Sequence, residues 1–130
     1  MKILIDTSKY SFKKYNDKGE VDYISPIPFL VNYGSCLDTI GEDGDRIDAI
    51  VLGKRLNKGY MEEFDKKGKI IFIDNGEEDT KFIFKNESIV LSDKIVVFVF
   101  FNAFAIFKLI LNKLRGKNGK TGIVKIIFNS

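Results

Sequence analysis

The residues of this sequence that are best suited to chemistry lie in an acidic turn ahead of an apolar run. Asp43 and Asp45 flank a glycine, and Asp48 follows three positions later. Four acidic side chains within residues 42–48 repel one another, and a bound cation relieves that repulsion. Mg²⁺ suits such a turn, because it prefers oxygen ligands and takes a few carboxylates while water and phosphate complete its coordination. An EF-hand is excluded, since Ile47 stands where that loop needs an oxygen ligand and no glutamate ends the loop.

A second acidic turn, residues 74–81, has similar chemistry and ends on a lysine. Asp74 opens an Asp-Asn-Gly sequence, a strong signal for a hairpin turn, and Asp79 and Lys81 follow it. Spacing alone leaves two interpretations open. Either the two turns build one site for divalent cations and phosphate, or both are solvated surface turns that bind nothing.

The composition narrows the chemistry that the chain can perform. Its 130 residues are enough for one hydrophobic core, so we expect a single domain spanning residues 1–130. The absence of histidine and the single cysteine, Cys36, exclude an imidazole zinc site, a thiolate zinc cluster and an internal disulfide. Carboxylates, lysines, tyrosines and bound ions remain. The N-terminal segment turns polar after a few apolar residues, which together with the lone cysteine favours a cytoplasmic protein without a signal peptide.

The hydrophobic pattern predicts many short strands and one late helix. Strands are expected at residues 3–5, 10–15, 21–24, 47–52, 69–73, 81–84, 89–91 and 123–128, with 16–20 as the turn of a hairpin. Residues 53–68 are predicted to form a loop with one helical turn at 60–64. Strand and helix compete over 95–101, and 103–114 is predicted to be helical.

Many short strands with tight turns favour a mainly β (α+β) protein, a small closed OB-like β-barrel with one or two C-terminal helices. The strong curvature of such a barrel would let two turns that are distant in sequence face one cavity. The most apolar run, residues 95–111, is interrupted by Asn102 and Lys108 and falls short of the usual spanning length. We interpret it as core, with a membrane helix as the minority alternative, so no membrane partner is expected.

Two motifs of the sequence resemble a known family. Asn-Tyr-Gly at 32–34 and Asp-Gly-Asp-Arg-Ile-Asp at 43–48 are similar to the signature of the soluble, Mg²⁺-dependent, barrel-type inorganic pyrophosphatases, in which D-G-D-P-x-D follows N-Y-G. The later D-x4-D-x-K element of that family fits residues 74–81 without a gap. The resemblance covers residues 3–84 best. It implies a divergent and shortened family member that hydrolyses pyrophosphate to two phosphates.

Roles for individual residues follow from this resemblance. Several Mg²⁺ ions would be bound by four aspartates: Asp43, Asp48, Asp74 and Asp79. Phosphate would be held by three lysines: Lys14, Lys81 and Lys113. Asp45 would be the general base that accepts a proton from the nucleophilic water, and Tyr33 would support the aspartates from behind.

Four positions depart from the pattern of the family: Asn16, Tyr23, Arg46 and Asn112. They stand, in that order, where the family has a glutamate, an arginine, a proline and a tyrosine. These changes put full catalytic power in question. Arg46 itself has two interpretations, a surface ion pair with a neighbouring acid or a cation that reaches into the pocket.

Two other functions stay open beside hydrolysis of pyrophosphate. A catalytically weakened relative would bind metal and phosphate or a nucleotide. A small nucleic-acid-binding barrel would combine the lysines of residues 113–125 with stacking aromatics: Tyr10, Tyr15 and Tyr23. The acidic turns would repel nucleic-acid phosphate, so nucleic acid is not an expected partner. The oligomers usual in the family and the Phe-rich segment 98–107 favour a homo-oligomer.

Overall fold

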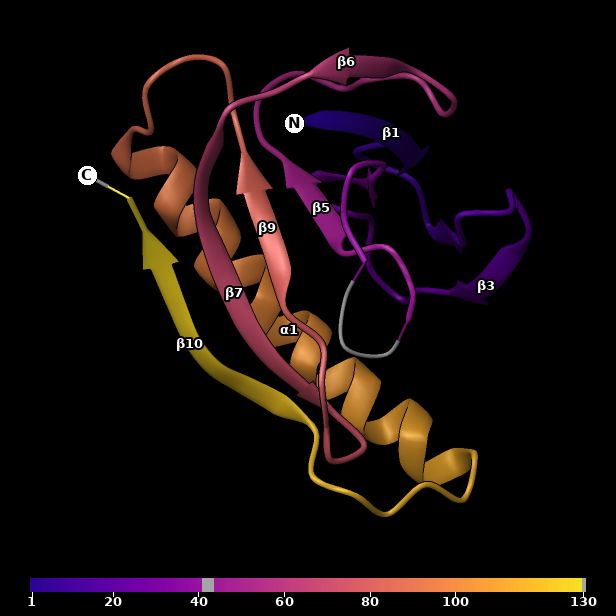
Figure 1. The fold of residues 1–130 in the computed structure, drawn as a ribbon. Coiled ribbons are helices and arrows are strands. Elements are labelled where there is room, and N and C mark those ends of the chain that lie inside the picture. Colours follow the sequence, from indigo (N-terminus) through magenta and orange to yellow (C-terminus); the bar gives the residue numbers. More distant parts are fainter. Residues whose placement is uncertain (41–43, 130) are drawn as a thin grey trace.

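The chain folds into a mostly β structure with one long helix, in a computed structural model that describes residues 1–40 and 44–129 (Figure 1). Its strands, in chain order, are β1 (Lys2–Thr7), β2 (Lys13–Tyr15), β3 (Val21–Ile24), β4 (Asn32–Cys36), β5 (Asp48–Val51), β6 (Met61–Glu63), β7 (Lys66–Asp74), β8 (Glu77–Glu78), β9 (Lys81–Phe84) and β10 (Gly122–Phe128). The helix, α1 (Leu91–Leu114), lies between β9 and β10. This confirms the prediction of a mainly β fold with a C-terminal helix.

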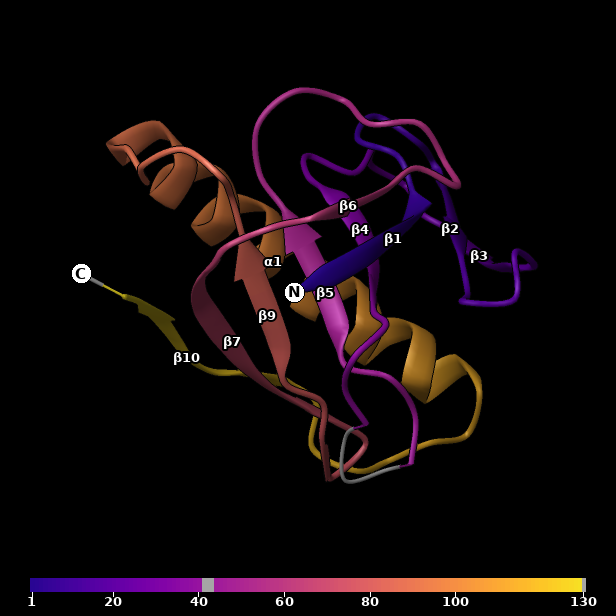
Figure 2. The same ribbon diagram turned by 45° about the horizontal axis from the view of Figure 1, so that its top comes forward.

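Most strands belong to one sheet, in the order β10-β7-β9-β5-β4-β1-β6, with β8 paired to β7. The remaining two, β2 and β3, form the predicted hairpin beside β1 (Figure 2). Strands β5 and β9 are parallel, whereas each is antiparallel to its other neighbour, β4 or β7. Because parallel neighbours begin at the same edge of a sheet, the first residues of β5 and β9 lie side by side. Closure of the sheet into a barrel stays a prediction.

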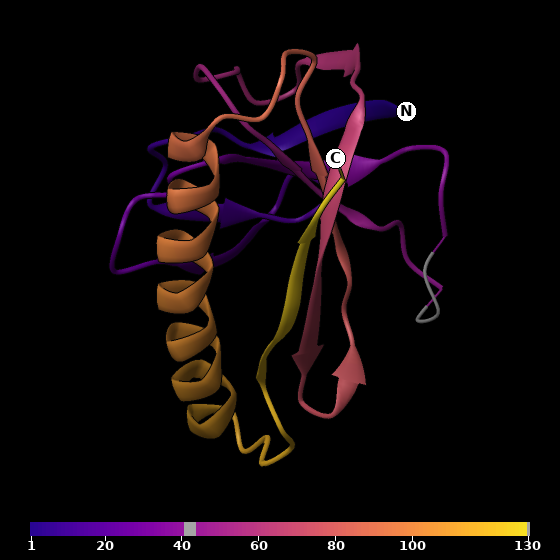
Figure 3. The same cartoon turned by 90° about the vertical axis from the view of Figure 1, so that its left-hand side faces the viewer.

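Helix α1 covers one face of this sheet (Figure 3). Its buried side chains recur with helical spacing and are mostly aromatic: Val97, Phe100, Phe101, Phe104 and Asn112. Phe104 packs on Phe72 of β7 with ring centroids 5.6 Å apart, and Phe100 packs on Phe29 at 5.1 Å. The Asp93 carboxylate accepts the N–H of Val90 at 2.9 Å, which satisfies a donor at the start of the helix.

Two local expectations are wrong, and one open alternative is decided. Residues 61–63 form β6, not a helical turn, because they pair with the outer edge of β1. Residues 89–91 are not a strand, since α1 begins at Leu91. The competition over 95–101 is decided for the helix, because α1 can bury one aromatic side against the sheet while its other side stays exposed.

Gly34 follows Tyr33 in β4, where β1 approaches closely. A Cβ at this position would clash with the carbonyl oxygen of Leu4. The glycine is therefore required by the pairing of β4 with β1, and that pairing keeps Tyr33 on the face that α1 covers.

Candidate active site

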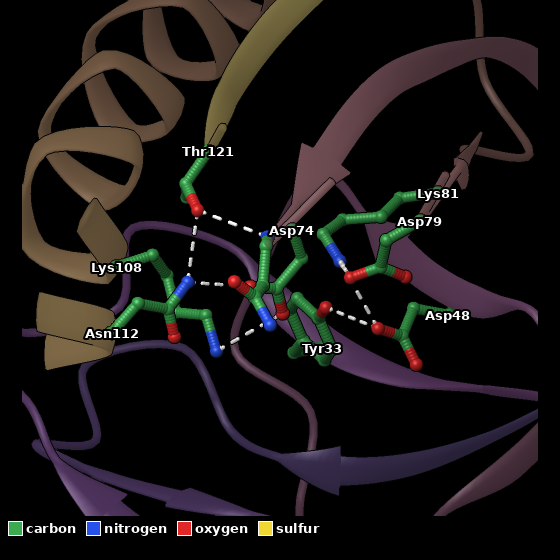
Figure 4. A network of polar contacts seen from close by, with 9 residues as sticks. Tyr33, Asp48, Asp74, Asp79, Lys81, Lys108, Asn112 and Thr121 are labelled. Carbon is green, nitrogen blue, oxygen red and sulfur yellow. Dashed lines mark hydrogen bonds and ion pairs between the residues drawn. The ribbon is translucent and has the colours of Figure 1, made fainter. Parts of the chain in front are cut away.

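A buried lysine joins the two acidic turns. Lys81 opens β9 and pairs in register with Asp48, the first residue of the parallel strand β5. Its side chain is 1% exposed, and its Nζ donates to Asp48 Oδ2 at 3.1 Å and to Asp79 Oδ2 at 2.9 Å (Figure 4). The two turns therefore meet at one edge of the sheet, as one of the two interpretations of the sequence required.

The charges in this cluster hold one another ionised. Burial alone would raise the pKa of Asp48, but the ammonium groups of Lys81 and Lys14 and the Tyr33 hydroxyl lower it on balance. Burial alone would lower the pKa of Lys81, but Asp48 and Asp79 raise it. Asp48 therefore remains a carboxylate and Lys81 an ammonium at neutral pH.

Tyr33 lies behind Asp48, where the resemblance puts it. Its buried hydroxyl donates to Asp48 Oδ2 at 2.6 Å. Burial, together with the charges of Asp48 and Asp79, raises the pKa of Tyr33 well above its ordinary value, so the hydroxyl remains a donor. The Nζ atoms of Lys14 and Lys81 lie 4.8 and 5.5 Å from the centroid of its ring. Tyr33 thereby holds the carboxylate by a hydrogen bond and presents its ring to two cations.

An adjoining polar cavity of about 320 Å³ gathers further predicted residues. Its lining includes Lys14, Asp45 and Asp48, and also Arg46 from the acidic turn. Arg46 thus borders the pocket, although its expected acidic neighbours at 42 and 43 lie outside the described residues. The predicted metal ligand Asp43 also lies outside them.

Asp6 of β1 is a residue of this cavity that the sequence interpretation missed. It is 7% exposed and its Oδ2 accepts the Ser35 hydroxyl at 2.6 Å. Burial raises the pKa of Asp6 to about 6, against the opposing effects of Ser35 and Lys14. The sequence feature that could have indicated Asp6 is its position directly after the apolar residues 3–5 of the first predicted strand.

Asp74, at the end of β7, has different surroundings. Its Oδ1 accepts the amide of Asn112 at 2.7 Å, and its Oδ2 lies 3.4 Å from Lys108 Nζ (Figure 4). The Asn112 amide also donates to Thr121 Oγ1 at 2.9 Å. Burial alone would raise the pKa of Asp74, but Asn112 and Lys108, with a smaller effect of Lys81, lower it. Both oxygens of this carboxylate are therefore engaged by α1.

The carboxylates differ in how well they fit Mg²⁺. Asp48 and Asp79 each use Oδ2 for Lys81, and within residues 1–40 and 44–129 no hydrogen bond or ion pair engages their Oδ1 atoms. No three acidic side chains of these residues group closely enough to hold a metal ion by themselves. Mg²⁺ keeps several waters and needs only one or two carboxylates. Asp48 and Asp79 therefore each keep an oxygen for the ion, whereas both oxygens of Asp74 already have a partner on α1.

The other predicted positions have mixed surroundings. Lys113 is exposed in the last turn of α1. Asn16 accepts the N–H groups of Lys18 and Glu20 at 2.9 and 3.0 Å, so it closes the β2–β3 turn. Tyr23 is buried, and its hydroxyl has no hydrogen-bond partner among the described residues. Of the four departures from the family pattern, Asn16 and Asn112 thus make structural hydrogen bonds, and Tyr23 packs in the hydrophobic core.

Carboxylates beside lysines offer oxygen ligands to a divalent cation and ammonium groups to phosphate, the chemistry of proteins that bind the two together. A model of one such family, described as inorganic pyrophosphatase, matches residues 4–96. The chain belongs to the inorganic pyrophosphatase family, whose enzymes hydrolyse pyrophosphate. The resemblance and the predicted activity are thereby confirmed.

Solved structures agree with this fold. An inorganic pyrophosphatase from Neisseria gonorrhoeae is 23% identical with a TM-score of 0.77, and one from Thermus thermophilus is 21% identical with a TM-score of 0.79. In both comparisons 98% of this chain and 82% of the other are covered. The pyrophosphatase from Helicobacter pylori has 23% identity and a TM-score of 0.72, with 99% and 84% covered. No curated protein sequence matches the chain.

Proposed function

We propose that the chain hydrolyses pyrophosphate at the cluster of Asp48, Asp79 and Lys81, with Mg²⁺ as its cofactor. The observation that supports this most directly is the buried Lys81 ammonium that joins an aspartate from each turn. Bound Mg²⁺ would supply an activated water and neutralise charge on the phosphates. Asp48 and Asp79 would hold the ion through their Oδ1 atoms, and Tyr33 would keep Asp48 in place.

The proton and the phosphates have separate acceptors in this proposal. Asp45, on the exposed turn that borders the cavity with Asp48, would accept the proton of the attacking water. Lys14 borders the same cavity and would hold a phosphate oxygen. Lys81 uses two of its three N–H donors on aspartates, which leaves one for a phosphate oxygen. Lys113, exposed in the last turn of α1, would attract phosphate from further out.

A weakened enzyme that mainly binds metal and phosphate is the second candidate. It is favoured by one observation, the engagement of both Asp74 oxygens by α1. The chemistry at Asp48 and Asp79 does not depend on that carboxylate, so we favour the active enzyme.

Phosphate release from pyrophosphate with Mg²⁺ tests the proposal. We expect activity in the native chain and a loss of at least about two orders of magnitude in Asp48→Asn. Asp65→Asn is the matched control, because that carboxylate is exposed in the described structure. Mg²⁺ binding without phosphate release would support the second candidate. Neither binding nor release across several divalent metals would contradict both.

We further infer a cytoplasmic homo-oligomer that associates through α1. One side of the helix bears exposed apolar side chains, with Ile95, Phe98 and Ile106 each more than half exposed. Several large apolar side chains exposed along one helix are a feature of interaction surfaces. By length and composition alone α1 could also cross a membrane, a property that the packed helix of a soluble domain shares. Light scattering of the native chain and of Phe98→Glu tests this inference, which predicts a fall in mass to the monomer.

A further inference from the structure

Lys108 brings a positive charge from α1 to the edge of the catalytic cluster. It lies one turn after the buried Phe104 and one turn before the buried Asn112, and residues four apart share one side of a helix. This places a lysine on the packed side of α1, where its side chain is only 13% exposed. Few lysines are buried to this degree without a partner, and here the partner is Asp74 at 3.4 Å.

Lys108 and Asn112 together satisfy the carboxylate of Asp74. Lys108 lies at Oδ2 and Asn112 at Oδ1, so the two oxygens are held from consecutive turns of one helix. Thr121, at the approach to β10, accepts both the Asn112 amide and the backbone N–H of Asn75. The resulting network engages both oxygens of Asp74 and holds this residue between α1 and β10 (Figure 4).

A divalent cation at Asp74 would meet two obstacles. It would have to share a carboxylate oxygen that already accepts the amide of Asn112 or lies beside the ammonium of Lys108. If Lys108 stayed, the ion would lie within a few ångströms of a like charge in a partly buried site, where repulsion is weakly screened. Asp48 and Asp79 also lie beside an ammonium, that of Lys81, but each directs only Oδ2 toward it, and among the described residues their Oδ1 atoms accept no hydrogen bond.

We propose that Lys108 is a built-in monovalent cation that takes the place of a metal ion at Asp74. Asp74 then acts as the anchor of Lys108 and not as a metal ligand, and divalent cations bind only on the side of Asp48 and Asp79. Lys108 is a positioning residue, because it acts through Asp74. The inference rests on the proposed function only in assuming that divalent cations bind to this cluster at all.

Counting bound ions without substrate tests the inference. Mn²⁺ serves as the probe, and the number of ions per chain is measured by electron paramagnetic resonance. We expect Asp74→Asn to bind as many ions as the native chain. Lys108→Met is expected to gain about one ion, because it frees Asp74 Oδ2, and the double variant with Asp74→Asn is expected to lose that gain.

Matched variants separate loss of charge from loss of structure. Lys108→Arg keeps the cation and is expected to bind the native number of ions, as is Lys94→Met, which removes an exposed lysine from the same helix. Thermal melting of the metal-free proteins identifies a variant that does not fold. If Lys108→Met is such a variant, the comparison of Asp74→Asn with the native chain decides the question.

Two results would overturn the role of Lys108. One is a lower ion count in Asp74→Asn than in the native chain, and the other is an unchanged count in a folded Lys108→Met. Both leave the proposed function intact, provided that Asp48→Asn still reduces binding. Absence of bound Mn²⁺ in every protein overturns this inference and the metal-dependent part of the proposed function together.

Discussion

Replacement of Lys81 by methionine tests whether the ion-pair cluster stabilises the fold. The ammonium is 1% exposed and lies 3.1 and 2.9 Å from two carboxylates that are 30% and 31% exposed. Removing one partner of a buried ion pair costs about 3–5 kcal/mol, because the remaining charges lose their compensation. Partial hydration of Asp48 and Asp79 favours the lower end, so we expect a loss of about 3 kcal/mol, or about 10 °C in melting temperature.

Urea unfolding followed by circular dichroism, with a chelator present, measures this loss. Lys125→Met is the matched control, since it removes an exposed lysine from β10 and should change stability by less than about 0.5 kcal/mol. If Lys81→Met loses no more than the control, the reasoning about buried charge is refuted.

The loss should also depend on pH. The folded pKa of Asp48 is lowered, so its stabilisation is present above the ordinary value of 3.8 and is lost as pH falls through the folded pKa. The folded pKa of Lys81 is raised, so its stabilisation is present below 10.5 and is lost as pH rises through the folded pKa. The difference between native chain and variant should therefore be constant between these limits and shrink below pH 3.8. A difference that grows on acidification would contradict this assignment.

Three more predictions concern the surroundings of the cluster. Tyr33→Phe removes the 2.6 Å hydrogen bond to Asp48 and should lower the free energy of unfolding in urea by about 1.5–3 kcal/mol. An unchanged free energy of unfolding would contradict this prediction. Asp6 has a raised folded pKa of about 6, so the free energy of unfolding should fall as pH rises from 3.8 to 6. Asp6→Asn should abolish this pH dependence, and an unchanged dependence in that variant would mean that another group causes it. Gly34→Ala should lower the melting temperature sharply, because the added Cβ would clash with the backbone of β1, which cannot move away without losing its hydrogen bonds to β4. A folded variant whose stability lies within about 1 kcal/mol of the native chain would show that the two strands can separate.

Much of the site could be predicted from the sequence because its residues are held in short, local motifs. The acidic turn before β5, the hairpin signal after Asp74 and the lysine that opens β9 each depend on neighbours within a few positions. The β2–β3 hairpin was predictable for the same reason, since Asn16 closes its own turn. Local patterns of this kind specify turns and strand starts before any tertiary contact forms.

Contacts between distant segments account for the errors. Strand β6 exists because β1 offers an edge to Met61–Glu63, and no local pattern reports that edge. Asp6 becomes a site residue because Ser35 of β4 lies close to it across the sheet. The contact of Lys108 with Asp74 likewise follows only from the way the helix docks on the sheet, and no local pattern reports it.

The sequence by itself determined which side chains are available for catalysis and binding. They are aspartates and lysines at spacings that fit a pyrophosphatase, in a chain without histidine. The tertiary structure decided which of them meet. Parallel pairing of β5 with β9 sets Asp48 beside Lys81, although 33 positions separate them in the chain. The docking of α1 on the sheet also sets the ion pair of Lys108 with Asp74. A helix that buries Phe104 against Phe72 of β7 brings the residue one turn later to the end of that strand.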